Sequence, residues 1–314
     1  MGTRSNIIFR IVLILLFFSD FAMPVSAQYG RLYVNVPRNY NYFQLHYYNT
    51  ISNSWAEQSI PNDKIQNITN TGSLSYTRVM NIFGRCGGPG IVIPYTNMLS
   101  FNEDTDTITY RNNGFGDPSL TLDCNIFGAP SLRKTQFDEH TPTNYMSAHY
   151  VMSFPFGNYN SSKTTNIGSN RYTYKFIVNY SITTMKGKNW IDMYASVKLA
   201  GKNTNYLEQF TLAQKPIYGF EFHYSQDVLG KLLGPHFWFD LGLIYSGGGR
   251  VVVGDNTGTD QNSLKACGSL SFPTWKHGSI IIGYNGTVWC SKDSPKTYQL
   301  VVQINCPFIV KSEM

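Results

Sequence analysis

Charged residues are scarce in this sequence, and long apolar runs are almost absent from it. Only 14% of the 314 residues are Asp, Glu, Lys or Arg, and the formal net charge is +6. The basic residues are spread along the chain, which argues against a nucleic-acid partner. After residue 27 no apolar stretch reaches the roughly 20 residues that a membrane-spanning helix requires. These absences predict a soluble product with no transmembrane anchor.

The one unbroken apolar run belongs to a predicted secretory signal. Ile11–Phe18 is wholly apolar, follows Arg4 and Arg10, and is followed by a Val-Ser-Ala tripeptide that ends at Ala27. A basic start, a short apolar centre and small residues before the cleavage point are the three parts of a signal peptide. We therefore expect residues 1–27 to be removed and the mature protein to be secreted and extracellular.

The usual spacings of catalytic and metal-binding residues are also missing. The sequence contains no GxSxG motif, no HxH or HExxH pair and no CxxC pair. No cofactor is expected, and whether the protein is an enzyme stays open, with a binding protein favoured. The weak catalytic candidates are Glu208, Glu221 and Asp240, which lie among aromatic residues in predicted strands. Paired acids across a groove are the machinery of a glycoside hydrolase, but these acids also fit the solvent face of amphipathic strands.

Five cysteines and four glycosylation sequons agree with the secretory route. Disulfides are the default state of cysteines in an exported chain without zinc-site spacing. By proximity we expect a Cys86–Cys124 bridge and a second bridge within the group Cys267, Cys290 and Cys306, and the odd cysteine allows a disulfide-linked dimer. The sequons predict N-glycosylation at Asn67, Asn160, Asn179 and Asn285.

What the sequence does contain is period-two alternation with many aromatic residues. From Arg171 to Thr184 the even positions are apolar and the odd positions are mostly polar. Successive side chains of a strand point to opposite faces, so we expect the even face to be buried and Asn179 to lie on the solvent face. The Asn-Gly pair at Asn285 and Gly286 predicts a tight hairpin turn.

The repeated alternation and the lack of helical periodicity indicate an all-β fold. We expect one or two antiparallel β-sandwich, jelly-roll-like domains after the signal peptide. An irregular stretch near residue 140 divides the chain into an N-terminal β domain (residues 28–135) and a C-terminal β-sandwich domain (residues 145–314). The alternative is a single large sandwich with long loops.

The function favoured by these patterns is extracellular binding of a carbohydrate or protein ligand. Tyr40, Tyr42 and Tyr48 lie among Asn and Arg residues and are the candidate ligand contacts. Two acidic loops are weak calcium candidates, and their carboxylates are Glu103, Asp104, Asp106, Asp255 and Asp260. A pore-forming toxin or effector is a further alternative, because residues 171–184 and 190–199 are long enough for barrel strands.

Overall fold

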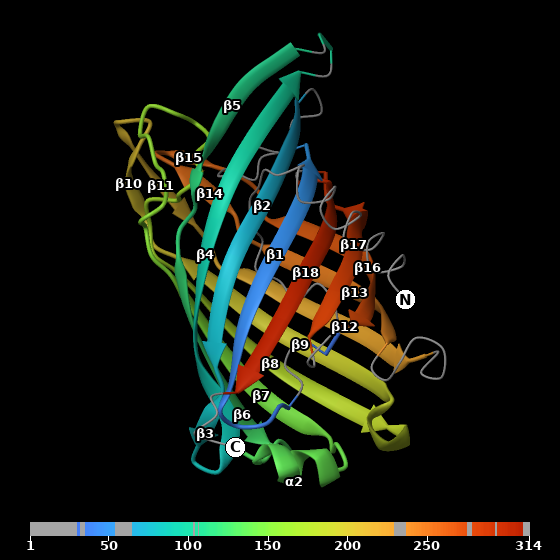
Figure 1. The fold of residues 1–314 in the computed structure, drawn as a ribbon. Coiled ribbons are helices and arrows are strands. Elements are labelled where there is room, and N and C mark those ends of the chain that lie inside the picture. Colours follow the sequence, from blue (N-terminus) through green and yellow to red (C-terminus); the bar gives the residue numbers. More distant parts are fainter. Residues whose placement is uncertain are drawn as a thin grey trace, which may run out of the picture.

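The computed structural model of the chain is a single closed β-barrel (Figure 1). The structure describes residues 30–31, 35–53, 65–102, 104–105, 107–228, 237–274, 278–292 and 294–309. The predicted signal peptide lies outside these residues. Among them, no helix has the length and apolar character needed to cross a membrane.

Twelve antiparallel strands form the barrel wall. They are β1 (Tyr40–Ser52), β2 (Ile65–Arg78), β4 (Arg85–Asn102), β6 (Ser119–Phe127), β7 (Tyr145–Ser153), β8 (Thr173–Thr184), β9 (Asn189–Ala200), β12 (Ile217–Asp227), β13 (Trp238–Gly248), β16 (Gln261–Pro273), β17 (Ser279–Cys290) and β18 (Thr297–Ile309). The pairing of β2 with β4, from Ile65↔Asn102 to Thr77↔Gly90, closes the sheet on itself. The prediction of a β-sandwich is therefore wrong, although the prediction of antiparallel strands is confirmed.

The remaining elements lie at the two ends of the barrel (Figure 1). At the end where β1 begins and β18 finishes are β3 (Met80–Ile82), the helix α2 (Lys134–Glu139) and the single 3₁₀ turn η1 (Met185–Gly187). At the opposite end, β5 (Thr107–Phe115) extends from β4. A four-stranded sheet also lies there and consists of β10 (Asn203–Tyr206), β11 (Phe210–Gln214), β14 (Val251–Val253) and β15 (Asn256–Thr257).

The predicted domain boundary falls in the connection between two neighbouring strands of the barrel wall. Strands β6 and β7, which flank it, are hydrogen-bonded neighbours from Ser119↔Ser153 to Phe127↔Met146. The irregular residues between them form the connection that carries α2. One sheet thus includes residues from both of the predicted domains.

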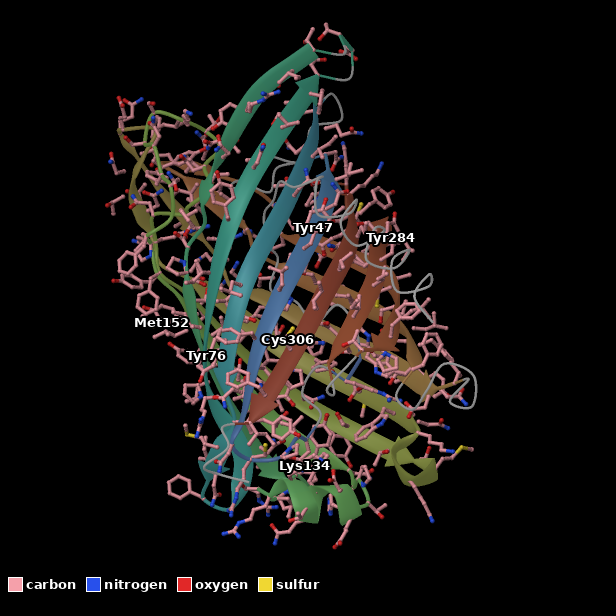
Figure 2. The ribbon with its side chains drawn as sticks, in the orientation of Figure 1. Tyr47, Tyr76, Lys134, Met152, Tyr284 and Cys306 are labelled. Carbon is pink, nitrogen blue, oxygen red and sulfur yellow. The ribbon has the colours of Figure 1, made fainter. Side chains whose placement is uncertain are left out.

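The polarity of the wall is the reverse of that of a soluble β-sandwich. On β8, the outward side chains of Phe176 and Val178 are 47% and 40% exposed, whereas Ile177 is buried and Asn179 and Ser181 are fully buried. The expectation that the even face of this strand is buried and that Asn179 lies on the solvent face is therefore wrong. Tyr284 on β17 is likewise 54% exposed, and the partly exposed side chains of Tyr76 and Met152 are labelled with it in Figure 2.

The outward face as a whole is a belt of large apolar and aromatic side chains. The exposed members include Phe43, Leu45, Leu74, Ile93, Leu120, Leu122, Phe220, Phe222, Leu241, Leu243, Leu270, Ile282 and Phe308. Soluble monomers rarely expose so many large apolar side chains on one face. Apolar side chains outside and polar side chains inside, alternating along each strand, are characteristic of barrels that span an outer membrane.

Candidate functional site

The inner face of the barrel is lined by hydrogen-bonded polar side chains. Asn67 of β2 accepts a hydrogen bond from Ser100 of β4, and Gln299 of β18 donates to Thr50 of β1 over 2.8 Å. Asn285 of β17 donates to Gln299 over 3.2 Å. Each of these side chains is at most 9% exposed. The lumen is therefore polar but narrow, since its wall side chains leave little surface accessible.

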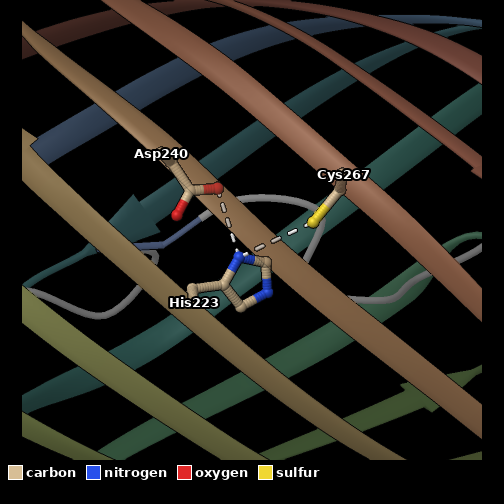
Figure 3. A group of neighbouring side chains, drawn as sticks. All are labelled: His223, Asp240 and Cys267. Carbon is tan, nitrogen blue, oxygen red and sulfur yellow. Dashed lines mark hydrogen bonds and ion pairs between the residues drawn. The ribbon is translucent and has the colours of Figure 1, made fainter.

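A group of ionisable side chains in the lumen lies on β12, β13 and β16. His223 on β12 is completely buried, and its Nδ1 lies 3.2 Å from Asp240 Oδ2 on β13 and 3.8 Å from Cys267 Sγ on β16 (Figure 3). On its other side, His223 Nε2 lies 3.7 Å from Glu221 Oε2. We call these four residues the His223 cluster.

Strand register brings the His223 cluster together, and a glycine makes room for it. His223 pairs with Gly242, and Gly242 pairs with Cys267, so the three residues form one row across adjacent strands. A β-carbon on Gly242 would lie 2.5 Å from His223 Nδ1 and 2.9 Å from Cys267 Sγ. The missing side chain at Gly242 is therefore what lets the imidazole and the thiol meet above it.

The hydrogen-bonding capacity of the cluster is incompletely used. Asp240 Oδ1, His223 Nε2 and Glu221 Oε2 are buried without a hydrogen-bond partner among the described residues. A buried polar atom without a partner costs about 1–3 kcal/mol. Three such atoms in one cluster indicate a place for a further polar group.

The chain before β1 lies against this cluster. The backbone N–H of Arg31 donates to Asp192 Oδ2 on β9 over 2.9 Å. A β-carbon on Gly30 would lie 2.8 Å from Asp240 Oδ1 and 3.2 Å from Asp192 Oδ2. The backbone at Gly30 thus passes directly over both carboxylates, inside the barrel.

The Arg31 side chain fixes this contact with several interactions. Its guanidinium forms an ion pair with Asp227, and it donates to Ser225 Oγ and to the Lys188 carbonyl oxygen, each over 2.8 Å. It also lies 5.8 Å and 5.4 Å from the ring centres of Trp190 and Trp238. Burial lowers the pKa of Arg31, and the charge of Asp227 opposes that shift. Because an arginine side chain stays protonated in proteins, Arg31 holds this part of the chain to the wall through its charge.

Residues 35–38 contact the other side of the barrel. The Val36 carbonyl oxygen accepts a bond of 3.4 Å from the Cys86 thiol on β4, and the Arg38 N–H donates to the Leu132 carbonyl oxygen over 2.8 Å. In the twelve-strand ring β4 lies diametrically opposite β13. Residues 30–31 and 35–38, which we call the N-terminal segment, therefore contact opposite walls near the end of the barrel where β1 begins.

Comparisons with known proteins agree with this architecture. Residues 48–265 match the model of the protein family described as "Putative MetA-pathway of phenol degradation". The chain belongs to this family. No curated protein matches the sequence significantly.

A solved outer membrane channel has the same fold. An outer membrane channel from Pseudomonas putida F1 is similar with a TM-score of 0.74 and 16% identity, covering 90% of this chain and 100% of that one. Two more distant similarities are to the β domain of a Bordetella autotransporter (TM-score 0.48, 9% identity, 85% and 99% covered) and to a mutant of the TodX monoaromatic hydrocarbon channel (0.47, 9%, 93% and 96%). The first similarity shows that this family member has the fold of an outer membrane channel.

Several functional predictions from the sequence are consequently wrong. A freely secreted, extracellular binding protein without a membrane anchor does not fit a closed barrel with an apolar outer belt. The prediction of an extracellular carbohydrate or protein ligand is therefore wrong as well. The residues 171–184 and 190–199, which suggested a pore-forming toxin, lie in the wall as β8 and β9.

The predicted disulfides are wrong as well, because all five cysteines are free. Gly87 is the register partner of Cys124, so Cys86, the residue before it, points to the opposite face of the sheet from Cys124. Cys267 is buried in the lumen, Cys306 is exposed on the outer face, and Cys290 lies at the far end of β17. The disulfide-linked dimer loses its basis for the same reason.

The acidic candidates divide into two groups. Glu221 and Asp240 both face the lumen and flank His223, whereas Glu208 is exposed in the turn between β10 and β11. The structure therefore brings Glu221 and Asp240 together but not Glu208, and a catalytic role of these acids stays a prediction. The sequence analysis did not place His223 and Cys267 in a site with these acids. The only feature of the sequence that indicates such a site is their position on the polar face of alternating strands.

The tyrosine candidates lie on the inner side of β1. Tyr40 is buried against Val79 and Cys86, and Tyr42 packs beside it. The Tyr48 hydroxyl lies 3.2 Å from His46 Nδ1. These tyrosines line the barrel interior instead of an exposed loop, and a role in ligand contact stays a prediction.

The calcium and glycosylation predictions remain untested, but the structure places their residues. Asp260 is paired with Arg250 at 2.6 Å, Asp255 and Asp104 are exposed, and Glu103 and Asp106 lie outside the described residues. Of the sequons, Asn160 lies in the exposed connection between β7 and β8. The other three, Asn67, Asn179 and Asn285, face the lumen, and Asn285 lies within β17 instead of at the predicted hairpin turn.

Proposed function

We propose that this protein is an outer membrane channel that conducts small solutes through the barrel lumen. The observation that carries the proposal is the reversed polarity of the wall, with a polar, hydrogen-bonded interior and an apolar exterior. Lipid replaces water around such a barrel, and closure leaves no unpaired strand edge in the membrane.

The connections at the two ends give the barrel an orientation. The connections at the end where β1 begins include the tight η1 turn. The connections at the other end are longer and contain β5, β10, β11, β14 and β15. Outer membrane barrels have short periplasmic turns and longer extracellular loops. The N-terminal segment then lies at the periplasmic end and the four-stranded sheet faces outward.

The inner charges bear on the kind of solute. Lys175 and Lys198 are register partners on the inner face of β8 and β9, and Lys265 lies on the inner face of β16. An anionic solute that enters from the outer end meets these ammonium groups. The family description concerns phenol degradation, so small aromatic acids are the first solutes to test.

Reconstitution into planar lipid bilayers tests the proposal. We expect discrete conductance steps that are smaller than those of 16–18-stranded porins, because the narrow lumen holds the N-terminal segment. Liposome swelling should be faster with benzoate than with a disaccharide. The absence of steps both in the full chain and in a variant lacking residues 28–38, with each shown to be folded, would contradict channel function.

A further inference from the structure

We infer that His223, Asp240 and Cys267 form a zinc site on the inner wall of the barrel, against the N-terminal segment. The imidazole nitrogen, carboxylate oxygen and thiol sulfur all lie within 4.8 Å of one another (Figure 3). These three donor types are those that zinc prefers in proteins. The site does not depend on conduction, so it can be tested whether or not the barrel is a channel.

The distances suit a tetrahedral ion. With metal–ligand bonds of roughly 2.0–2.3 Å, ligand atoms of a tetrahedral site lie about 3.3–3.8 Å apart. His223 Nδ1 lies 3.2 Å from Asp240 Oδ2 and 3.8 Å from Cys267 Sγ. Zinc can therefore bind between the three atoms with small side-chain adjustments, and the thiol loses its proton on binding.

The unpartnered atoms supply an independent reason to expect a cation here. Asp240 Oδ1 is a buried acceptor that receives no hydrogen bond from the described residues, and Glu221 Oε2, on the Nε2 side of His223, is another. Asp192 adds a third carboxylate, which is completely buried beside the same point of the N-terminal segment. A divalent ion would compensate this concentration of buried negative charge more fully than the hydrogen bond from His223 does.

The backbone also creates the space for the site. Gly242 lies between His223 and Cys267 in this row, so no side chain separates the two donor atoms. Because Gly30 lies against Asp240, the ion would be held between the wall and the N-terminal segment. Zinc would thereby strengthen the attachment of that segment to the wall.

Metal titration of the folded, detergent-purified full chain tests this inference. We expect one equivalent of Zn²⁺ to bind, and Co²⁺ in its place to show a thiolate-to-cobalt charge-transfer band. Cys267→Ser and His223→Gln should each weaken binding at least about tenfold and abolish that band, because losing even an outer-shell partner of a metal site typically costs about 10–100-fold in affinity. Cys306→Ser is the matched control, because its thiol lies on the outer face, and it should bind zinc normally.

A variant that keeps every ligand separates a metal site from a hydrogen-bonded network. Gly242→Ala should weaken Zn²⁺ binding by crowding His223 and Cys267, whereas Gly268→Ala, whose β-carbon has no neighbour closer than 3.4 Å, should not. Folding of each variant is checked by heat-modifiable mobility on gels. In the unsubstituted chain, Zn²⁺ should also protect Cys267 from maleimide labelling, which peptide mapping reports.

Two results would overturn the inference. One is stoichiometric zinc binding that Cys267→Ser leaves unchanged, which would place the ion elsewhere. The other is the absence of both zinc binding and protection of Cys267 in the folded full chain, which would show that the three residues form only a hydrogen-bonded network.

Discussion

Replacing Arg31 with alanine is expected to raise the time-averaged conductance of the reconstituted barrel at least about tenfold. The variant loses the ion pair with Asp227 and the hydrogen bonds to Ser225 and Lys188. A hydrogen bond to a charged group contributes about 1.5–3 kcal/mol, and about 1.4 kcal/mol changes an equilibrium tenfold. The N-terminal segment should therefore leave the lumen more often, which single-channel recording measures as a higher open fraction.

Arg250→Ala is the matched control for this experiment. Its guanidinium also pairs with a carboxylate, Asp260, but both side chains are largely exposed and lie far from the N-terminal segment. Exposed ion pairs contribute little to stability, so the conductance should stay at the level of the unsubstituted chain. Equal open fractions in the Arg31 and Arg250 variants would show that Arg31 does not hold the segment in place.

A charge placed on the outer belt should have the second large effect. Leu243 lies at the centre of β13, points outward and is 49% exposed. If this face contacts lipid, Leu243→Arg should reduce the free energy of unfolding by about 2–4 kcal/mol, the cost of an arginine near the bilayer midplane. Urea unfolding from lipid vesicles, followed by tryptophan fluorescence, measures the change.

The control for the outer belt is a residue near its edge. Tyr298 points outward at the start of β18, where the wall meets the outer loops, and Tyr298→Arg should cost only about 0–1 kcal/mol. In a protein surrounded by water, an arginine at either exposed position would be tolerated equally. Equal stability of the two variants would therefore contradict a lipid-facing belt.

The sequence predicts the strands of this protein but not which of their faces is inside. Alternation from Arg171 to Thr184 is an accurate guide to β8, and the same pattern marks β9, β12 and β18. Period-two alternation, however, only separates two faces. In water the apolar face of a strand is buried, whereas in lipid it is exposed. The prediction assumed water, and Asn179 therefore faces the lumen instead of the solvent.

Two of the four residues of the His223 cluster could be selected as candidates from the sequence. Glu221 and Asp240 could be selected because paired acids flanked by aromatic residues in strands fit a glycosidase groove. His223 and Cys267 could not be joined to them, because the cluster depends on the register of three strands and on Gly242 between them. The prediction of a hairpin turn at Asn285-Gly286 is wrong for a related reason. Strand β17 continues through this pair, and Asn285 is the register partner of Cys267 on β16 and of Gln299 on β18.

A nitroxide scan along β8 tests the reversed polarity of the barrel most directly. Spin labels are attached one at a time at positions 176–181, in a chain whose native cysteines are replaced by serine, and the folded barrel is placed in lipid vesicles. Labels at 176, 178 and 180 should collide strongly with oxygen dissolved in the lipid, whereas labels at 177, 179 and 181 should be shielded from it. The opposite alternation, or equal exposure of all six labels to a water-soluble relaxation agent, would contradict a membrane-spanning barrel.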